Sequence, residues 1–214
     1  MEKHKDFWNL ILVGKWNKYI LSPQWAAKNI FEEPELQVEF PLNLDFPLRY
    51  TSLEKNIRLL PAEDKVIFVP LKLDDECLSE VGKLTNKLFE MLPHTPMRAF
   101  GINFGFSEKD NTELYKVFNV IDNAKLGEFN CELKQTCIIR RTVYDENNLN
   151  LRLTLKGNEV LFDFNFHYDV KNAVEAKEKL KDNIVKNKNA AEKLLQEVYG
   201  LSYDDIEQKK RGVV

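Results

Sequence analysis

The chain has 214 residues, of which 43% are hydrophobic and 30% are charged, and its net charge is −3. This length suits one large domain or two closely packed small ones, and roughly 70% of the unfolded surface can be buried without disulfides or metals. The slightly negative charge argues against binding to nucleic acid or acidic membranes through bulk electrostatics, although it is compatible with a local basic patch.

The three cysteines, Cys77, Cys131 and Cys137, lack the spacing of a disulfide framework or a zinc site. We therefore expect buried thiols, no metal and no cofactor. The N-terminus does not resemble a signal peptide, and no apolar run of 18 residues is present. We expect a soluble cytoplasmic protein.

In the first part of the chain, the apolar run 10–16 predicts a buried strand, and Ser22-Pro23 predicts the start of a helix that ends before Pro34. The alternation at 36–40 predicts a half-buried strand. Residues 41–56 are interpreted as a long loop without regular structure.

Two further strands are predicted at 57–60 and 66–70, and the prolines beside them favour short strands or strands at a sheet edge. A helix follows, beginning at Asp74 or Asp75 and ending at Met91, because its apolar residues recur at helical spacing.

The segment 92–106 contains a turn with two prolines and then a strand, 97–106, whose even positions are apolar. We expect this strand to be central, with Gly101 and Gly105 on one face, where glycine permits a close approach of another backbone. A helix capped by Asp110 or Asn111 is predicted to reach residue 121.

From Cys131 the pattern predicts a three-stranded antiparallel meander at 131–144, 149–156 and 160–169, with one apolar and one polar face. A long helix, 171–199, follows and ends at Gly200; the asparagines at 183, 187 and 189 indicate a break within it. A short turn at 202–205 and a basic tail at 208–211 end the sequence.

The predicted fold class is α+β, a mostly antiparallel sheet packed with helices and ending in the meander and the long helix. The half 1–127 is organised around strand 97–106, and the half 128–214 contains the meander and the C-terminal helix. No linker rich in Gly, Ser or Pro separates the halves, so we expect one continuous body that unfolds as a unit.

The sequence contains two sets of motifs: VGKWN followed by LSPQW, at 13–17 and 21–25, and LPHTP followed by GINF, at 92–96 and 101–104. Together they resemble a family of uncharacterised, sporadically distributed bacterial proteins. The resemblance spans about the first half of the chain. It implies a bacterial origin and an accessory role, and it carries no activity.

One candidate binding site consists of His94, Thr95, Arg98 and Asn103, near the turn with two prolines. An arginine there is able to hold a carboxylate or phosphate through two parallel hydrogen bonds. The alternative is structural: His94 and Thr95 bond the turn backbone, and Arg98 pairs with a nearby acid.

A second candidate is the polar face of the meander, with Arg140, Arg152, Asp163 and His167. Alternate strand positions place such groups on one surface, where His167 and Asp163 or Asp169 are able to form a general-base pair. The alternative is a solvated face of mixed charge. Nucleic-acid binding is disfavoured because the aromatic residues of these strands alternate onto the other face.

The catalytic motifs of nucleotide-binding enzymes, serine hydrolases and zinc proteases are absent from the sequence, so it names no catalytic residue and favours a non-enzymatic function. The first hypothesis is a binding or scaffolding protein whose sheet contacts another protein, either a second copy or a different chain. The rival is an enzyme or accessory component of a bacterial defence or mobile-element system that acts on nucleic acid or a phosphorylated ligand.

Overall fold

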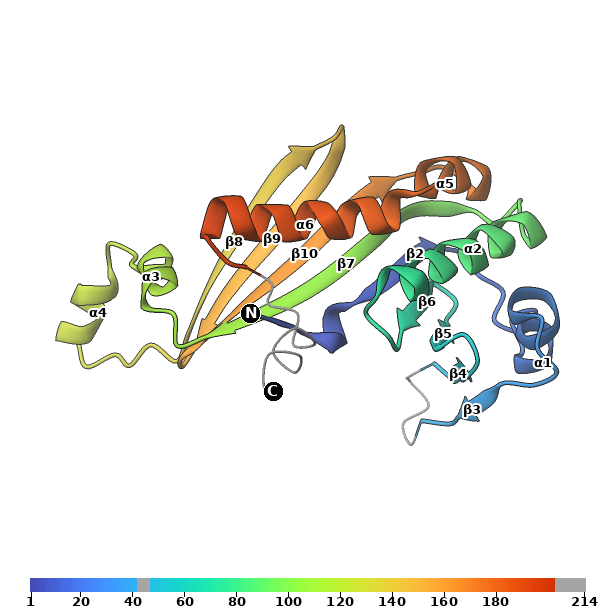
Figure 1. Cartoon of the computed structure of the whole chain (residues 1–214), viewed down its shortest axis with the longest axis horizontal. Coiled ribbons are helices and arrows are strands. Elements are labelled where there is room, and N and C mark those ends of the chain that lie inside the picture. The colour runs from blue at the N-terminus through green and yellow to red at the C-terminus, as the bar shows by residue number, and fades with distance from the viewer. Residues whose placement is uncertain (42–46, 203–214) are drawn as a thin grey trace, which may run out of the picture.

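The structure is a computed structural model of the chain and describes residues 1–41 and 47–202. Its main feature is one antiparallel sheet in the order β3-β4-β5-β6-β2-β7-β10-β9-β8, in which β1 also pairs with β7 (Figure 1). The strands are β1 (Glu2–Lys3), β2 (Asn9–Gly14), β3 (Gln37–Glu39), β4 (Arg49–Ser52), β5 (Ile57–Pro61), β6 (Lys65–Pro70), β7 (Met97–Lys109), β8 (Gln135–Tyr144), β9 (Asn147–Lys156) and β10 (Glu159–Asp169).

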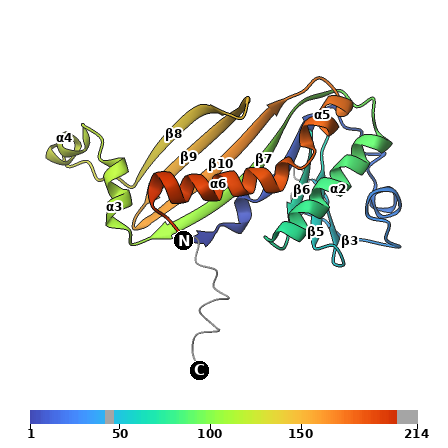
Figure 2. The ribbon, with the colours of Figure 1, turned by 45° about the horizontal axis from the view of Figure 1, so that its top comes forward.

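Three helices pack against one face of this sheet (Figures 1 and 2): α2 (Asp75–Met91), α5 (Ala173–Leu180) and α6 (Asn183–Tyr199). We call the opposite face the open face. The remaining helical segments are η1 (Lys5–Phe7), α1 (Pro23–Ala26), η2 (Ala27–Phe31), α3 (Thr112–Tyr115), η3 (Lys116–Phe118) and α4 (Asn123–Glu128). Among the described residues, no helix is both long and apolar enough to cross a membrane.

The core lies between the sheet and these three helices. Even-numbered residues of β7 and β10 point into it, and Phe100, Phe104 and Phe106 are almost completely buried. Phe100 stacks on Tyr168 at 4.5 Å between ring centroids. Full burial of one such ring stabilises the fold by roughly 1.5–3 kcal/mol. The fold class expected from the sequence, α+β with a C-terminal meander and helix, is therefore confirmed.

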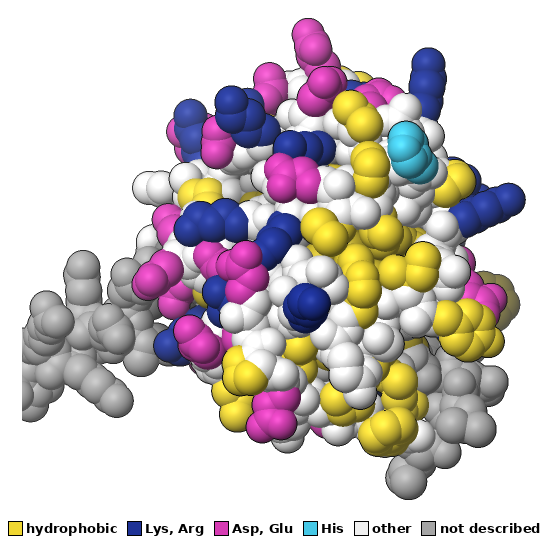
Figure 3. All heavy atoms as spheres, turned by 90° about the vertical axis from the view of Figure 1, so that its right-hand side faces the viewer, with side chains coloured by type: hydrophobic (Ala, Val, Ile, Leu, Met, Phe, Trp, Pro, Cys, Tyr) yellow, Lys and Arg dark blue, Asp and Glu magenta, His cyan; other side chains and the backbone are white. Residues whose placement is uncertain are grey.

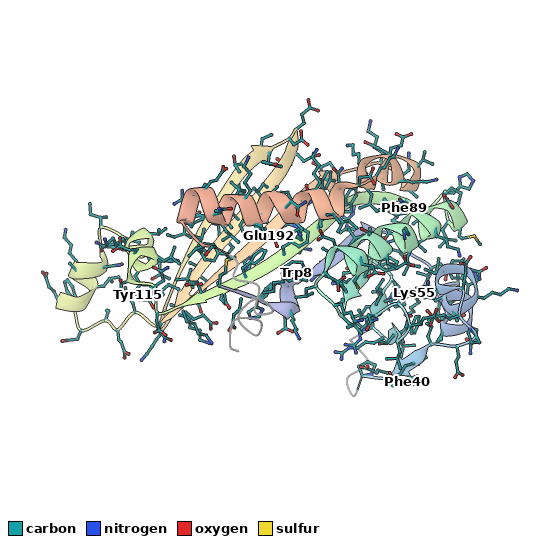
Figure 4. All side chains as sticks on the ribbon, viewed as in Figure 1. Trp8, Phe40, Lys55, Phe89, Tyr115 and Glu192 are labelled. Carbon is teal, nitrogen blue, oxygen red and sulfur yellow. The ribbon has the colours of Figure 1, made fainter. Side chains whose placement is uncertain are left out.

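Strand β7 is central, as expected: β2 pairs with it on one side, and β10 pairs with it over eleven residues on the other. Since β7 belongs to the half 1–127 and β10 to the half 128–214, one sheet runs through both halves. Trp8 lies beside β7 (Figure 4), where its Nε1 donates a hydrogen bond to the Gly105 carbonyl oxygen at 2.7 Å.

Several local predictions are confirmed by their caps. Ser22 accepts a hydrogen bond from the Trp25 amide at the start of α1, and Asp74 accepts one from the Cys77 amide at the start of α2. Gly200 ends α6 in the left-handed conformation, with φ of 66°. The expected break in the C-terminal helix lies at Lys181 and Asp182, because Asp182 adopts a φ of 57°.

Other predictions were wrong. The interval 41–56 contains β4, which pairs with β5 through Tyr50 and Leu59. Of the two alternatives for β5 and β6, the edge position is wrong, because both lie inside the sheet; both are short, with five and six residues. The helix expected to reach residue 121 is divided into α3 and η3. The predicted turn after Ser202 and the basic tail lie outside the described residues.

The expectation of buried thiols holds for Cys77 alone; Cys131 and Cys137 are exposed. Burial raises the pKa of the Cys77 thiol. Cys137 lies on β8, opposite Thr154 of β9, at the outer part of the sheet. The exposure of Cys137 follows from the position of β8 at the sheet edge, where one side of the strand has no neighbour among the described strands.

Candidate binding site

The first predicted cluster does not form one site. His94 and Arg98 are exposed, and among the described residues no side-chain hydrogen bond or ion pair joins them to Thr95 or Asn103. Arg98 lines a surface hollow of about 790 Å³ together with Trp16 and Met97, whereas Asn103 lies farther along β7 on the open face. Arg98 forms no ion pair with an acid of the described residues.

The second predicted cluster is largely brought together. Asp163 and His167 of β10 and Arg152 of β9 lie on the open face, and Asp163 is the direct cross-strand neighbour of Arg152. Arg140 is an exception, because it lies opposite Leu151, a residue of the helix-covered face. The arginine of β8 on the open face is Arg141, opposite Asn150.

A row of four asparagines crosses the open face, one from each of four adjacent strands, and we call it the asparagine row. Asn150 Nδ2 donates to Asn165 Oδ1 at 2.9 Å, and Asn165 Nδ2 donates to Asn103 Oδ1 at 2.7 Å. Asn103 Nδ2 in turn donates to Asn9 Oδ1 at 2.8 Å. All three bonds run in the same direction, so the side chains hold one another in fixed orientations.

Two glycines of β7 allow neighbouring groups to approach the backbone of this strand closely. A Cβ at Gly101 would lie 2.7 Å from Asn165 Nδ2, and one at Gly105 would lie 2.5 Å from Phe7 Cβ. Glycine therefore permits the asparagine row at the first position. At the second, it lets the segment before β2 lie against β7, because a Cβ there would also be only 3.2 Å from the His4 carbonyl oxygen.

Asp163 is an acid of this face with a shifted pKa. Burial raises the pKa of its carboxyl group, while the charges of Arg152 and His4 act in the opposite direction. Its Oδ1 is buried, as is Nδ1 of His4, and neither atom has a hydrogen-bond partner among the described residues. A carboxyl group in this setting favours the protonated state more than an exposed one does.

His167 lies at one end of the face, and its Nε2 is 3.2 Å from Asp169 Oδ1. This is one of the two pairs considered from the sequence, and Asp163 is not its partner. The Asp169 side chain is mostly exposed. A general base also needs a positioned reacting group, so this exposed pair does not by itself define an active site.

A hollow of about 710 Å³ lies over the outer part of the open face. It is lined by polar groups of β8, β9 and β10, among them Arg141, Arg152, Asn150 and Asn165, and by the apolar residues Ile139 and Val143. The aromatic residues Phe162, Phe164 and Phe166 are buried on the opposite face. Stacking platforms for bases are therefore not provided by β10 here.

Strand β8 forms one edge of the sheet and pairs with β9 alone among the described strands. It has ten residues and contains neither proline nor glycine, and Ile139 and Val143 are 53% and 69% exposed. The other edge, β3, has three residues. Edge strands are usually short, bent or covered, because their free N–H and C=O groups pair readily with another strand.

A separate apolar surface lies at the other end of the molecule, where Figure 3 shows hydrophobic side chains between charged ones. A groove of about 550 Å³ there is lined by Tyr19, Phe40 and Tyr50, of which Tyr19 and Phe40 are 82% and 77% exposed. Phe40 is labelled in Figure 4. Its lining also includes Pro41 and Pro47, and the residues between them in the sequence lie outside the described part of the chain.

Comparison with known proteins adds no family: no protein-family model and no curated protein matches this sequence. The site therefore has to be interpreted from its own geometry. That geometry joins a long strand, β8, with one edge unpaired among the described strands, to a polar surface whose asparagine side chains are held in place and whose arginines are exposed.

Proposed function

We propose that this protein is a non-enzymatic binding protein of the bacterial cytoplasm that engages another protein through the edge of β8. The partner contributes an extended segment that pairs with the free backbone of β8 and adds a strand to the sheet, a mode of recognition used by several peptide-binding domains. The observation that carries the proposal is the ten-residue, largely exposed edge strand beside the hollow on the open face.

Main-chain hydrogen bonds supply affinity in this mode, and side chains on alternate positions supply specificity. The asparagine row supports the same interpretation, because its hydrogen bonds help to hold β7, β10 and β9 in register, and β9 is the strand on which β8 pairs. Packing of α6 and α5 on the opposite face holds the sheet in place. Binding therefore requires little rearrangement of the protein itself.

The native cysteines allow a direct test with a matched control. A photo-activated crosslinker is attached to Cys137 in a Cys131→Ser chain, and to Cys131 in a Cys137→Ser chain; buried Cys77 stays unlabelled in both. We expect the label on β8 to crosslink one partner in cells through an extended segment, and that purified partner to slow amide exchange in β8. Equal crosslinking from both positions, or unchanged exchange in β8, contradicts the proposal.

A second candidate function is an accessory role in a defence or mobile-element system, with binding to nucleic acid or a phosphorylated ligand. The observation that favours it is the presence of Arg141 and Arg152 on one face. Phosphate binding of this kind weakens steeply with salt. This candidate predicts that the protein retains an oligonucleotide at low salt, loses it at a few-fold higher salt, and needs Arg141 for the retention. No retention at low salt excludes the candidate.

A further inference from the structure

The surface next to β8 also indicates which kind of strand it receives. We propose that the partner segment is acidic and places a carboxylate on the open face, where Arg141 and Arg152 bind it. This inference rests on the strand addition proposed above. Three observations support it: the position of these two arginines, the absence of ion pairs between them and the described residues, and the composition of β8.

The two arginines are neighbours across β8 and β9. Arg141 lies opposite Asn150, and Arg152 lies opposite Ile139, so Arg141 and Arg152 occupy a diagonal across the strand pair. Diagonal neighbours in an antiparallel pair are about 7–8 Å apart, which long side chains span. A single carboxylate above Ile139 is therefore within reach of both guanidinium groups.

Both arginines are available for a ligand. Arg141 is exposed and forms no ion pair or side-chain hydrogen bond with any described residue. Arg152 faces Asp163 across the strands, yet these side chains form no ion pair in the described part of the chain. An exposed arginine that forms no ion pair with a described residue is able to bind a partner's carboxylate through paired hydrogen bonds, and for Arg152 the partner's carboxylate competes with the nearby Asp163.

An added strand places its side chains where this contact requires them. Successive residues of the partner alternate between the two faces, so every second side chain lies over the open face. The partner residues opposite Arg141 and Ile139 are on that face, because Arg141 and Ile139 themselves are. Cross-strand pairs of opposite charge stabilise a sheet, whereas like charges directly opposite each other destabilise it.

The same composition argues against a second copy as the occupant. Between Gln135 and Tyr144 the strand contains two arginines and no acid. If the β8 strands of two copies paired, the guanidinium groups of both would lie at the interface, and neither strand would supply a carboxylate to neutralise them. An acidic segment of another protein neutralises this edge, and a second copy does not.

Three synthetic peptides, each about as long as β8, test the inference. They share valine at alternate positions and carry glutamate, glutamine or lysine at the positions between, and their dissociation constants are measured by titration calorimetry at low salt. We expect the glutamate peptide to bind best and the lysine peptide worst. Exposed ion pairs of this kind change affinity by up to roughly fivefold each, so we expect a ratio of roughly fivefold between glutamate and glutamine peptides.

Two neighbouring arginines provide the variant and its control. Arg141→Gln removes one of the two open-face guanidinium groups and should reduce the preference for the glutamate peptide over the glutamine peptide, with Arg152 retaining the rest. Arg140→Gln removes a similar exposed charge from the helix-covered face and should leave the preference unchanged. Equal losses from both substitutions overturn the assignment of the carboxylate to the open face.

The failure of each proposal gives a different result. Equal binding of all three peptides, with slowed exchange in β8, overturns the acidic partner and leaves strand addition in place. Absence of binding by all three peptides overturns strand addition, and this inference with it. Self-association that Arg141→Glu strengthens indicates a second copy instead and also overturns the inference.

Discussion

The asparagine row predicts a graded loss of stability. Asn165 takes part in two side-chain hydrogen bonds of the row, whereas Asn150 takes part in one. A hydrogen bond of this type contributes about 1 kcal/mol net, so Asn165→Ala should cost about 2 kcal/mol and Asn150→Ala about 1 kcal/mol. For a chain of this size, the melting temperature should fall by about 4–8 °C and about 2–4 °C, respectively.

Urea denaturation measures this prediction, with the midpoint and the slope fitted separately so that changes in the denatured state are recognised. Asn148→Ala is the control, because Asn148 is exposed on the same face and forms no side-chain hydrogen bond with a described residue. It should change the free energy of unfolding by less than about 0.5 kcal/mol. Equal costs for Asn165→Ala and Asn150→Ala, or a similar cost for the control, would refute the row as a stabilising unit.

Three further predictions concern single side chains. A thiol reagent should modify two cysteines in the native protein, Cys131 and Cys137, and Cys77 only after unfolding, because Cys77 is buried and its pKa is raised. Asp163→Asn should raise the free energy of unfolding at neutral pH. Burial raises the pKa of Asp163 in the folded state, so ionisation of this carboxyl group destabilises the fold as the pH rises above the pKa that Asp163 has in the unfolded chain. This gain should vanish as the pH falls to the unfolded pKa of about 4, and denaturation at both pH values measures it; a gain that is independent of pH contradicts the cause. Arg98→Ala should change stability by less than about 0.5 kcal/mol in the same assay, since Arg98 is exposed and unpaired among described residues; a loss of about 3–5 kcal/mol would indicate a buried ion pair.

Elements with a clear period were predictable from the sequence. Strand β10 alternates apolar and polar residues from Phe162 to Asp169, and α2 repeats its apolar residues at helical spacing. Strand β4 has the sequence RYTS and no such alternation, and it forms through pairing with β5. A short strand of this kind depends on its pairing partner, so its own residues do not indicate it.

The candidate site was predictable in part, for a similar reason. Asp163 and His167 were assigned correctly to the open face, because β10 alternates without interruption from Phe162 to Asp169. Strand β8 contains Ile138-Ile139 followed by Arg140-Arg141, so its phase is ambiguous, and a shift of one residue exchanges the two faces. The sequence therefore favoured Arg140 where the structure has Arg141.

The asparagine row illustrates a second limit. Its members come from four strands, and the hydrogen bond from Asn103 to Asn9 joins residues 94 positions apart. Nothing in the local sequence around each asparagine indicates that the four side chains share one row. Only the register of β2, β7, β10 and β9 brings them together.

Amide exchange in β8 tests the central claim most directly. Hydrogen exchange is followed residue by residue in the free chain and in its complex with the glutamate peptide. The account predicts slower exchange at those amides of β8 that point away from β9, and unchanged exchange at the opposite edge, β3. Protection at β3 or on α6 with no change in β8 would contradict recognition by strand addition.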